Sequence, residues 1–488
     1  MKVVVLMIVM WLLAVVGMEA TEDGGIFTVC PFGVAGQNGC DFIGGDGIQA
    51  AVDAAFMGAV GEKTTVLLKS GKYFRRSFVE FSRIVGGSVE KQKCFVGIKG
   101  KQIIIEGEST SSLDGSASGD NMSGLCIEGG DVEIKNLVVS GFKESRKSDY
   151  SSGVYSLGCG VYADGDARLF ISDSVIEDNQ GCGVGLGGSV QAVLIRDAIS
   201  GNGMDSGVGV SNFASVFIVD STIGRNRAGG LVGVEHSRIT LKDSLVRDNE
   251  GEGLFVAGSA WAAVSGSSFL ENTREAISLV NQSQITVRNS VVQGNGGDGI
   301  FVSNGSSAVV TNNTVVGNKM GGIGCVLGSK CVTKNNIVVG NYRGIYGGDI
   351  QYNLSWNSRM APYLPRLDFS VYDLGGTLTE IGLQSHNISL DPVFVNADGN
   401  DFRLKVGSPA IDAGDPTICD TDGSRSDLGF TGGGGRCSNL GDAGGGGQGG
   451  LVGVPNPASF FCVDMGYQNI EGMCVNGEEK CKEWSFFR

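Results

Sequence analysis

Proline is scarce in this sequence, at 8 of 488 residues, although glycine is abundant at 81. A collagen-like triple helix requires a strict glycine triplet and abundant proline, so that class is excluded. Positive charge is also in deficit, because the formal net charge is −15 and the pI is about 4.7. An acidic chain of this kind argues against DNA, RNA or an anionic membrane as its main partner.

Long apolar runs are missing after the N-terminus, so no later segment is expected to span a bilayer. Residues 1–20 differ, because Lys2 precedes an almost unbroken apolar run from Val3 to Val16 and a small residue follows at Ala20. This pattern is typical of a secretory signal peptide, and an uncleaved anchor is the alternative. The sequence therefore predicts a protein that is secreted or at the cell surface, with the periplasm as a further possibility.

An asparagine recurs every 23 or 24 residues through the middle of the chain. An apolar residue stands three positions before each of these asparagines, and a second apolar series stands eight positions before with one exception, Thr333. A third apolar series stands about five positions after most of them, as at Leu254 and Ile300. Each repeat therefore contains about three short β-rich runs, separated by polar or glycine corners. The asparagines are Asn179, Asn202, Asn226, Asn249, Asn272, Asn295, Asn318 and Asn341.

This repeat predicts an all-β fold, a single-stranded right-handed parallel β-helix solenoid of about 23 residues per coil. A helical repeat would need two amphipathic helices, which the Gly, Ser, Asn and Val content disfavours. Asparagine tolerates a left-handed backbone at a tight bend, and stacked amides can pair with one another. The asparagines are therefore expected to form a structural ladder, and a second polar series, exemplified by Asp243-Ser244 and Asn312-Asn313, another.

The domain organisation follows from where the repeat begins and ends. The best helical segment, 46–57, is expected to cover the open end of the hydrophobic column. The expected parts are a signal peptide at 1–20, an N-terminal cap at 21–64, the β-helix at 65–412, an Asp-rich closing loop at 413–436, a Gly-rich linker at 437–459 and a Cys-containing tail at 460–488.

Both ends of the repeat region resemble the pectate lyase-like superfamily of right-handed parallel β-helix proteins. The run from Gly47 to Ala55 is similar to the N-terminal capping helix of that superfamily. The segment from Asp391-Pro-Val-Phe394 to Asp415 is similar to the closing segment of many bacterial members. The resemblance implies the fold over roughly residues 45–435. It leaves the activity open, because the fold hosts lyases, hydrolases, epimerases and non-catalytic surface proteins.

The catalytic motifs that this resemblance suggests are absent. Pectin hydrolases of the fold use clustered Asp residues with a Gly-His-Gly element, and alginate epimerases carry Asp-Pro-His-Asp. The only two histidines, His236 and His386, stand in neither motif and are expected to be surface turn residues.

Two acidic clusters are candidate Ca²⁺ sites. Glu252, Glu275 and Asp298 are 23 residues apart, so the repeat stacks them on consecutive coils. Carboxylates this close share a cation, act as an acid/base pair or form a solvated acidic corner. The second cluster has alternating carboxylates with a glycine, where the alternatives are a Ca²⁺ loop and an Asp-rich capping turn. Its members are Asp420, Asp422 and Asp427.

Thirteen cysteines agree with an oxidising compartment, and their connectivity stays open. Cys325 and Cys331 occupy apolar positions of the repeat, so buried thiols are expected there. Six Asn-x-Ser/Thr sequons, among them Asn304, matter if the source glycosylates its secreted proteins. The disulfide candidates are Cys30 with Cys40, Cys159 with Cys182, Cys419 with Cys437, and the cluster Cys462, Cys474 and Cys481.

Three functions compete at this level. The first is a non-catalytic extracellular protein that binds carbohydrate or acts as a surface or adhesive module, with a polysaccharide as its partner. The second is a polysaccharide lyase, hydrolase or epimerase acting on an acidic glycan with Ca²⁺. The third is a periplasmic metal-handling β-helix protein. A groove lined by Arg, Lys and aromatic side chains would favour the enzyme.

Overall fold

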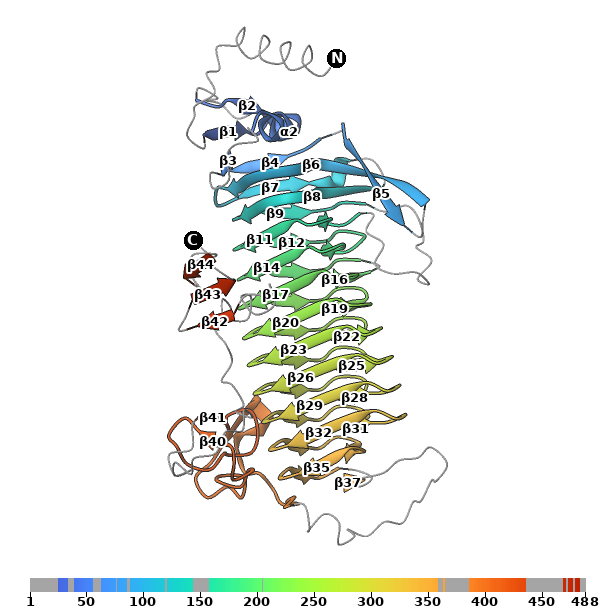
Figure 1. The fold of residues 1–488 in the computed structure, drawn as a ribbon, viewed down its shortest axis with the longest axis vertical. Coiled ribbons are helices and arrows are strands. Elements are labelled where there is room, and N and C mark those ends of the chain that lie inside the picture. The colour runs from blue at the N-terminus through green and yellow to red at the C-terminus, as the bar shows by residue number, and fades with distance from the viewer. Residues whose placement is uncertain are drawn as a thin grey trace.

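The computed structural model is a long solenoid that rises coil by coil along one axis (Figure 1). Three short strands per coil stack on the equivalent strands of the next coil in parallel register, so the predicted fold is confirmed. The described residues are 25–33, 39–55, 63–75, 77–85, 88–118, 121–143, 158–203, 205–358, 363–364, 386–435, 468–470, 473–476 and 479–482. The expected signal peptide lies outside them.

The three strands of each coil build three faces. The first face contains β10 (Val161–Asp164), β13 (Val184–Leu186), β16 (Ser206–Val210), β19 (Gly229–Gly233), β22 (Leu254–Ala257), β25 (Ile277–Val280), β28 (Ile300–Val302), β31 (Gly321–Cys325) and β34 (Arg343–Tyr346). The second contains β11 (Arg168–Ser172), β14 (Gln191–Ile195), β17 (Ser215–Val219), β20 (Arg238–Lys242), β23 (Trp261–Ser265), β26 (Gln284–Arg288), β29 (Ser307–Thr311), β32 (Lys330–Lys334) and β35 (Asp349–Gln351). The third contains β12 (Val175–Glu177), β15 (Ala198–Ser200), β18 (Thr222–Gly224), β21 (Leu245–Arg247), β24 (Ser268–Leu270), β27 (Val291–Gln293), β30 (Thr314–Val316), β33 (Ile337–Val339) and β36 (Leu354–Trp356).

The N-terminal part caps this column. Helix α2 (Gly44–Ala54) begins two residues before the expected helix, and residues 56–62 lie outside the described part. Its Ile48, Ala51 and Val52 are buried in the core. The other elements are β1 (Ile26–Cys30), β2 (Phe42–Ile43), β3 (Thr64–Leu68), β4 (Gly71–Tyr73), β5 (Val79–Val85), β6 (Ser88–Gly107), β7 (Ser111–Asp114), the 3₁₀ turn η1 (Gly115–Ala117), β8 (Met122–Lys135) and β9 (Val138–Ser140).

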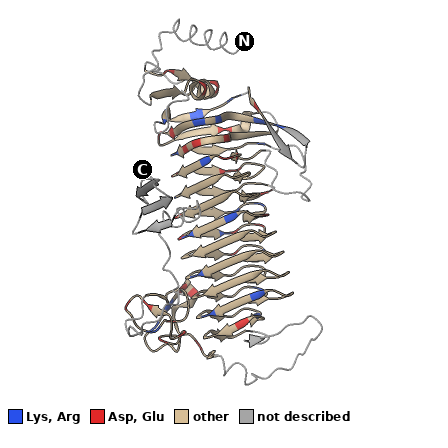
Figure 2. Ribbon diagram, in the orientation of Figure 1, with Lys and Arg blue, Asp and Glu red and all other residues tan. Residues whose placement is uncertain are grey.

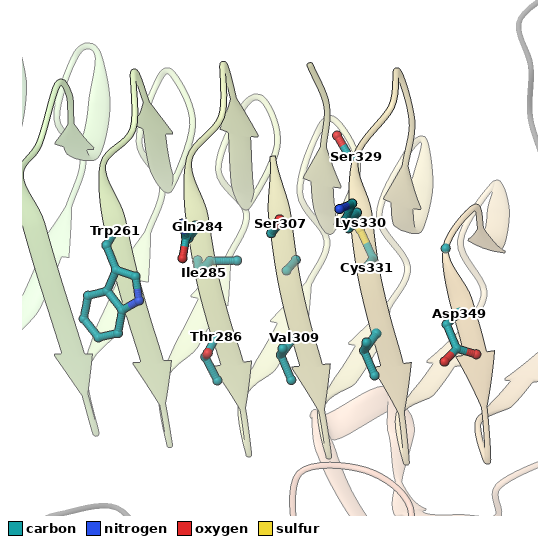
Figure 3. A pocket seen from close by; sticks show the side chains of 13 residues that line it. Trp261, Gln284, Ile285, Thr286, Ser307, Val309, Ser329, Lys330, Cys331 and Asp349 are labelled. Atoms are coloured by element: carbon teal, nitrogen blue, oxygen red, sulfur yellow. The ribbon is translucent and has the colours of Figure 1, made fainter. Parts of the chain in front are cut away.

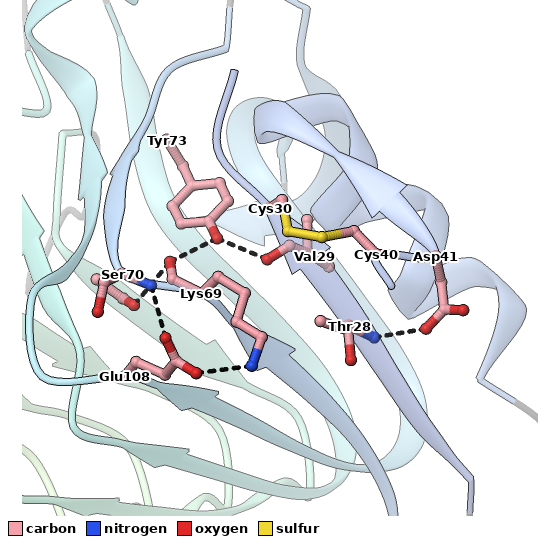
Figure 4. The surroundings of a disulfide bond; sticks show 10 residues. Thr28, Val29, Cys30, Cys40, Asp41, Lys69, Ser70, Tyr73 and Glu108 are labelled. Atoms are coloured by element: carbon pink, nitrogen blue, oxygen red, sulfur yellow. Dashed lines mark hydrogen bonds and ion pairs between the residues drawn. A yellow bond between two sulfur atoms is a disulfide. The ribbon is translucent and has the colours of Figure 1, made fainter. Parts of the chain in front are cut away.

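A disulfide and a buried tyrosine fasten the cap to the first coil (Figure 4). Cys30 and Cys40 are bonded, which confirms that pair. The Tyr73 hydroxyl donates to the Val29 carbonyl oxygen at 2.7 Å and to the Lys69 carbonyl oxygen at 2.8 Å. Because Tyr73 is fully buried, these bonds satisfy its hydroxyl where water cannot.

The asparagine ladder is confirmed. Each Nδ2 donates to the Oδ1 of the next asparagine at 2.8–3.1 Å, from Asn179 through to Asn341. The same Oδ1 accepts the backbone N–H of the preceding ladder residue, as between Asn272 and Asn249 at 3.2 Å. All eight side chains are buried, so the ladder satisfies the corner where the chain leaves the third face.

The expectation that the ladder asparagines themselves adopt the left-handed backbone was wrong. None of the eight has a positive φ; the residue just before each one does, for example Asp248 at 56° and Glu271 at 55°. The ladder residues therefore supply the side-chain hydrogen bonds, and the left-handed bend is made by their neighbours. Gly253 shows a further constraint, because a Cβ there would lie 2.8 Å from Phe269 Cδ1 and 3.0 Å from Asn272 Nδ2.

The second polar series forms its own ladder, in which each backbone N–H donates to the side-chain oxygen of the next coil. It runs through Ser174, Asp197, Ser221, Ser244, Ser267, Ser290, Asn313, Asn336, Asn353 and Asn387.

The C-terminal part departs from the expected boundaries. The sequence predicts the β-helix to residue 412, whereas the last described strand of its sheets is β37 (Tyr363–Leu364). Ile388 still pairs in parallel with Leu354 of β36, and residues 389–433, called the C-terminal clasp below, pack on the outside of the third face. The remaining elements are β38 (Phe394–Asn396), η2 (Ala397–Gly399), β39 (Asp401–Leu404), β40 (Cys419–Asp420), β41 (Gly434–Gly435), β42 (Gln468–Ile470), β43 (Met473–Asn476) and β44 (Glu479–Lys482).

Candidate functional site

The outer side of the second face carries the most distinctive surface of the solenoid. Strand alternation sends residues one, three and five of each five-residue strand outward and buries residues two and four. In β23, Ala262 and Val264 enter the core, whereas Trp261, Ala263 and Ser265 stay partly exposed. Since the strands are in register, Trp261 stands in one column with Gln284 and Ser307.

A shallow hollow of about 550 Å³ runs across β23, β26, β29, β32 and β35 (Figure 3). Its floor has apolar side chains, including Val309 and Val332, and Trp261 stands at one end. Polar groups lie between them on successive strands. Those lining the hollow are Gln284, Thr286, Ser307, Ser329, Lys330 and Asp349.

The charge of this face is opposite to that of the whole chain. No outward position of β20, β23, β26, β29 or β32 is acidic. Five are basic, and in Figure 2 blue segments stand isolated along a mostly uncharged solenoid. Within the described residues, Arg288 and Lys330 have no ion-pair partner. The basic residues are Arg238, Lys242, Arg288, Lys330 and Lys334.

This arrangement suits an elongated ligand. Successive strands offer polar groups about 4.8 Å apart, the usual spacing of paired strands. The Trp261 indole supplies a large apolar surface with one N–H donor. Unpaired cations attract anionic groups at separations up to about 10 Å in moderate salt.

The predicted acidic corner is assembled only in part. The backbones of Glu252, Glu275 and Asp298 stack on successive coils, as their hydrogen bonds to the preceding coil show. Their side chains have different partners. Glu252 Oε1 lies 3.4 Å from Arg274 Nη1, whereas the Asp298 carboxylate accepts from the Gly321 backbone N–H and the Tyr346 hydroxyl.

Asp298 is the deepest member of that corner, at 5% exposure. Burial raises the pKa of Asp298, and the bonds from Tyr346 and Gly321 oppose that rise. The Tyr346 ring lies above Gly324, where a Cβ would meet Tyr346 Cζ at 2.3 Å. Tyr346 therefore acts as a cover that fixes the Asp298 oxygens to the fold.

The second acidic cluster holds together the C-terminal clasp. The Asp420 carboxylate accepts the backbone N–H groups of Asp427 and Gly433, and Asp427 Oδ1 accepts that of Asp412 at 2.8 Å. Asp422 Oδ1 accepts the Ser424 N–H at 2.9 Å. Burial raises the pKa of Asp420 and of Asp427. These bonds are those of an Asp-rich capping turn.

The donors of neither cluster converge as a Ca²⁺ ion requires. In the described part of the chain, no group of three or more His, Cys, Asp or Glu side chains is arranged to hold a metal ion. Ca²⁺ prefers six to eight oxygens, and these carboxylates are turned toward backbone N–H groups, a tyrosine and an arginine. Calcium binding stays a prediction for measurement.

Two of the predicted cysteine pairs are confirmed, and one expectation about the cysteines was wrong. Cys159 and Cys182 are bonded across neighbouring coils with their Cα atoms 4.4 Å apart, as expected. Cys325 and Cys331 form a disulfide, so the expectation of buried thiols was wrong. Their two interior positions face each other across one turn, 6.2 Å apart at Cα, which is bonding distance.

The remaining cysteines include a pair that the sequence did not indicate. Cys94 and Cys126 are bonded between β6 and β8, which pair in register. Cys419 is disulfide-bonded, and Cys437 and Cys462 lie outside the described residues. Cys474 stands opposite Cys481 in the β43–β44 pair.

Both histidines are exposed turn residues, as predicted. His236 stacks on Phe213 with ring centroids 5.2 Å apart, and His386 stacks on Tyr352 at 4.6 Å.

The sequence reasoning missed the hollow. Its signal was present, because Trp261 and the basic residues of the second face occupy the first and fifth positions of successive runs. Aligning the repeats by outward position would have placed them on one face.

Sequence comparison identifies the family. The profile described as "Right handed beta helix region" matches residues 88–232, 123–291 and 202–342, which together span more than half of the chain. The chain belongs to this family. A search of curated proteins finds no significant match. Among the described residues, no helix is long and apolar enough to cross a membrane.

Solved structures to which the chain is similar include an epimerase module, a pectate lyase and a tailspike protein. The A-module of the Azotobacter vinelandii mannuronan C-5 epimerase AlgE4 is 18% identical, with a TM-score of 0.45 over 68% of this chain and 95% of that one. Pectate lyase Pel9A is 16% identical, with a TM-score of 0.45 over 85% and 97%. The Dettilon tailspike protein is 13% identical, with a TM-score of 0.33 over 62% of each chain. Matches this weak carry no argument about activity.

Proposed function

We propose that this chain is an exported β-helix protein that binds a polysaccharide along the outer side of its second face. The observation that carries the proposal is the hollow with Trp261 at one end and polar groups on each following strand. A tryptophan is a frequent energetic anchor of binding surfaces because it buries a large area with few rotatable bonds. The four described disulfides support export to an oxidising compartment.

The charge of the face favours an acidic polysaccharide over a neutral one. The whole chain repels polyanions with its net charge of −15, so binding needs local cations. Arg288 and Lys330 supply them without a carboxylate partner in the described residues. Attraction of this kind weakens with salt, which gives a second readout.

Two tryptophans make a matched test. Binding would be measured by calorimetry against neutral and uronate-containing oligosaccharides, for the parent, Trp261→Ala and Trp356→Ala. Trp356 is 38% exposed on the third face and serves as the control. Trp261→Ala should weaken binding about tenfold or more, and Trp356→Ala should leave it unchanged. Equal binding by all three proteins, or binding by none, would overturn the proposal.

A lyase or epimerase acting on an acidic glycan is the second candidate, because Lys330 places an exposed amine in the hollow. A hydrolase is disfavoured, since glycoside hydrolysis uses two carboxyl groups and Asp349 is the one carboxylate among the described lining residues. Incubation with polyuronate separates these cases. Unsaturated or epimerised product that disappears in Lys330→Ala would establish the enzyme, and intact polymer supports the binding protein.

A further inference from the structure

Six sequons for asparagine-linked glycosylation occur in the chain, and their surroundings differ sharply. Such a sequon places an acceptor amide two residues before a hydroxyl, and the attached sugar needs an open surface. The six acceptors are Asn121, Asn281, Asn304, Asn312, Asn353 and Asn387.

The side-chain amides of three of the six acceptors already donate hydrogen bonds within the fold. Asn312 is 3% exposed, and its Nδ2 donates to Ser426 and Asp427 of the clasp at 3.0 Å. Asn353 is fully buried in the second ladder, and its Nδ2 donates to the Thr333 and Gln351 carbonyl oxygens. Asn387 is half-buried; its Nδ2 donates to the Ile350 carbonyl oxygen at 3.0 Å, and its Oδ1 accepts the Asn353 backbone N–H at 2.9 Å. A sugar on any of these nitrogens would break the ladder or lift the clasp.

Asn281 and Asn304 are placed differently. They stand one coil apart in equivalent turns between the first and second faces, and both are exposed at positive φ. Asn304 Nδ2 donates to Asn281 Oδ1 at 3.3 Å. The adjoining space is open, because a Cβ at Gly305 would meet only Gln282 Cγ, at 3.8 Å.

The exposed side chain of Leu327, next to Asn304, favours an attached sugar that covers it. Leu327 occupies the same turn one coil further on and is 55% exposed, with a backbone φ of 52°. A sugar attached to Asn304 can lie against this exposed apolar side chain and remove it from water.

We propose that Asn281 and Asn304, the two exposed acceptors among the six, carry glycans in the exported protein, whereas the half-buried Asn121 and the three hydrogen-bonded acceptors do not. In the transfer, the asparagine Nδ2 bonds to the anomeric carbon of a lipid-linked oligosaccharide diphosphate. The bond from that carbon to the diphosphate breaks, the lipid diphosphate leaves, and Nδ2 loses one proton. The nitrogen keeps its second hydrogen, so the bond from Asn304 to Asn281 is compatible with modification.

The location links this modification to the hollow. Asn281 and Asn304 precede Gln284 and Ser307, two of its lining residues, by three positions. Glycans there border one side of the hollow and narrow the approach for a long polymer. The inference shares with the proposed function only the export of the chain, so failure of polysaccharide binding does not touch it.

The test is site mapping on full-length protein secreted from a host that glycosylates asparagine. Enzymatic glycan release in ¹⁸O water, followed by peptide mass analysis, should mark Asn281, Asn304 or both, and leave Asn121, Asn312, Asn353 and Asn387 unmarked. The double variant Asn281→Gln/Asn304→Gln should lose the corresponding glycan mass. Asn357→Gln is the control, because Asn357 is also exposed at positive φ but lies outside any sequon. Folded, secreted protein with glycan at neither Asn281 nor Asn304, or with glycan on any of the other four acceptors, would overturn the proposal.

Discussion

The same backbone corner carries different residues in the upstream coils, up to β23, and in the downstream coils, from β26 onward. At the left-handed position before the second ladder, the upstream coils carry exposed charged residues, such as Asp173, Arg196 and Asp243. The downstream coils carry Asn289, Asn312 and Asn335 at the same position with similar φ values.

The difference lies in what covers the corner. Arg196 and Asp173 pair with each other in solvent at 2.7 Å. Asn312 and Asn335 instead hold the clasp, since Asn335 Oδ1 accepts the Asp415 backbone N–H at 2.7 Å. A change from charge to amide at a fixed repeat position therefore marks where a second segment docks, because a buried amide can be satisfied at lower cost than a buried charge.

The largest expected effect lies in the second ladder, where an upstream carboxyl stands at a position that downstream coils fill with asparagine. Asp197 is 2% exposed, its Oδ2 has no partner in the described structure, and burial raises its pKa to about 7. The folded state therefore binds this proton more tightly than the unfolded chain. The contribution of Asp197 to stability should be greatest in acid and fall as the pH rises from about 4 to about 7.

Asp197→Asn gives the upstream coil the downstream residue. At neutral pH it should stabilise the protein by on the order of 4 kcal/mol and flatten the dependence between pH 4 and 7, because no charge is then buried. Urea unfolding across that range measures both effects. A pH profile unchanged by the substitution would show that Asp197 does not control it.

A smaller effect is expected where the clasp docks. Asn335→Ala should cost about 2–3 kcal/mol more than Asp243→Ala, because both lose a residue tolerant of the left-handed backbone but only Asn335 leaves buried partners unsatisfied. Thermal unfolding of the two variants measures this difference. Equal losses would mean that the clasp adds nothing at this corner.

An ion pair gives the next comparison. Lys334 Nζ lies 2.9 Å from the Asp415 carboxylate, which is 9% exposed, whereas Lys242 lies 3.2 Å from the exposed Asp243. Burial acts to raise the pKa of Asp415, but bonds from Lys334 and Thr417 outweigh it and hold that pKa below its usual value. This stabilisation is present at neutral pH and is lost as the pH falls through the lowered pKa.

Lys334→Ala should therefore cost about 1–2 kcal/mol at neutral pH, and Lys242→Ala about 0.5 kcal/mol or less. The gap between the two variants should close in acid. Chemical denaturation at both pH values tests this, and a constant gap would contradict the pairing.

The smallest effect is expected on adding Ca²⁺. This test compares the acidic cluster of the coils, which contains Glu275 and Asp298, with that of the clasp, which contains Asp420 and Asp422. Because Asp298 of the first set and Asp420 of the second already accept backbone hydrogen bonds, millimolar Ca²⁺ should leave the melting temperature unchanged relative to chelator. A rise would report a bound ion. Its loss in Glu275→Gln would place the ion on the coils, and its loss in Asp422→Asn would place it in the clasp.

The fold could be predicted from the sequence because every coil repeats the same pattern of buried apolar and hydrogen-bonded polar residues. Asn272 and its equivalents indicate a buried, hydrogen-bonded corner in every coil. Few folds other than a parallel β-helix can bury three apolar series within a repeat of 23 residues. The Cys159–Cys182 pair follows from the same register, whereas the capping helix follows from the helical pattern of residues 46–57.

The features that escaped prediction depend on contacts between distant or differently spaced segments. Tyr346 reaches Asp298 two coils away, after one coil that is a residue shorter, so constant spacing does not find it. The clasp docks on residues about 80 to 140 positions earlier. Cys325 and Cys331 occupy interior positions of the repeat. At such positions the sequence pattern is the same for a cysteine that packs as an apolar side chain and for one that forms a disulfide.

A crystal structure of the protein with its tightest-binding oligosaccharide would show whether the outer side of the second face binds polysaccharide. We expect sugar rings against Trp261 and along Gln284, Ser307 and Lys330, with acidic groups toward Arg288 or Lys330. An oligosaccharide seated instead beside Glu252 and Phe255 on the first face, with the hollow empty, would contradict this expectation.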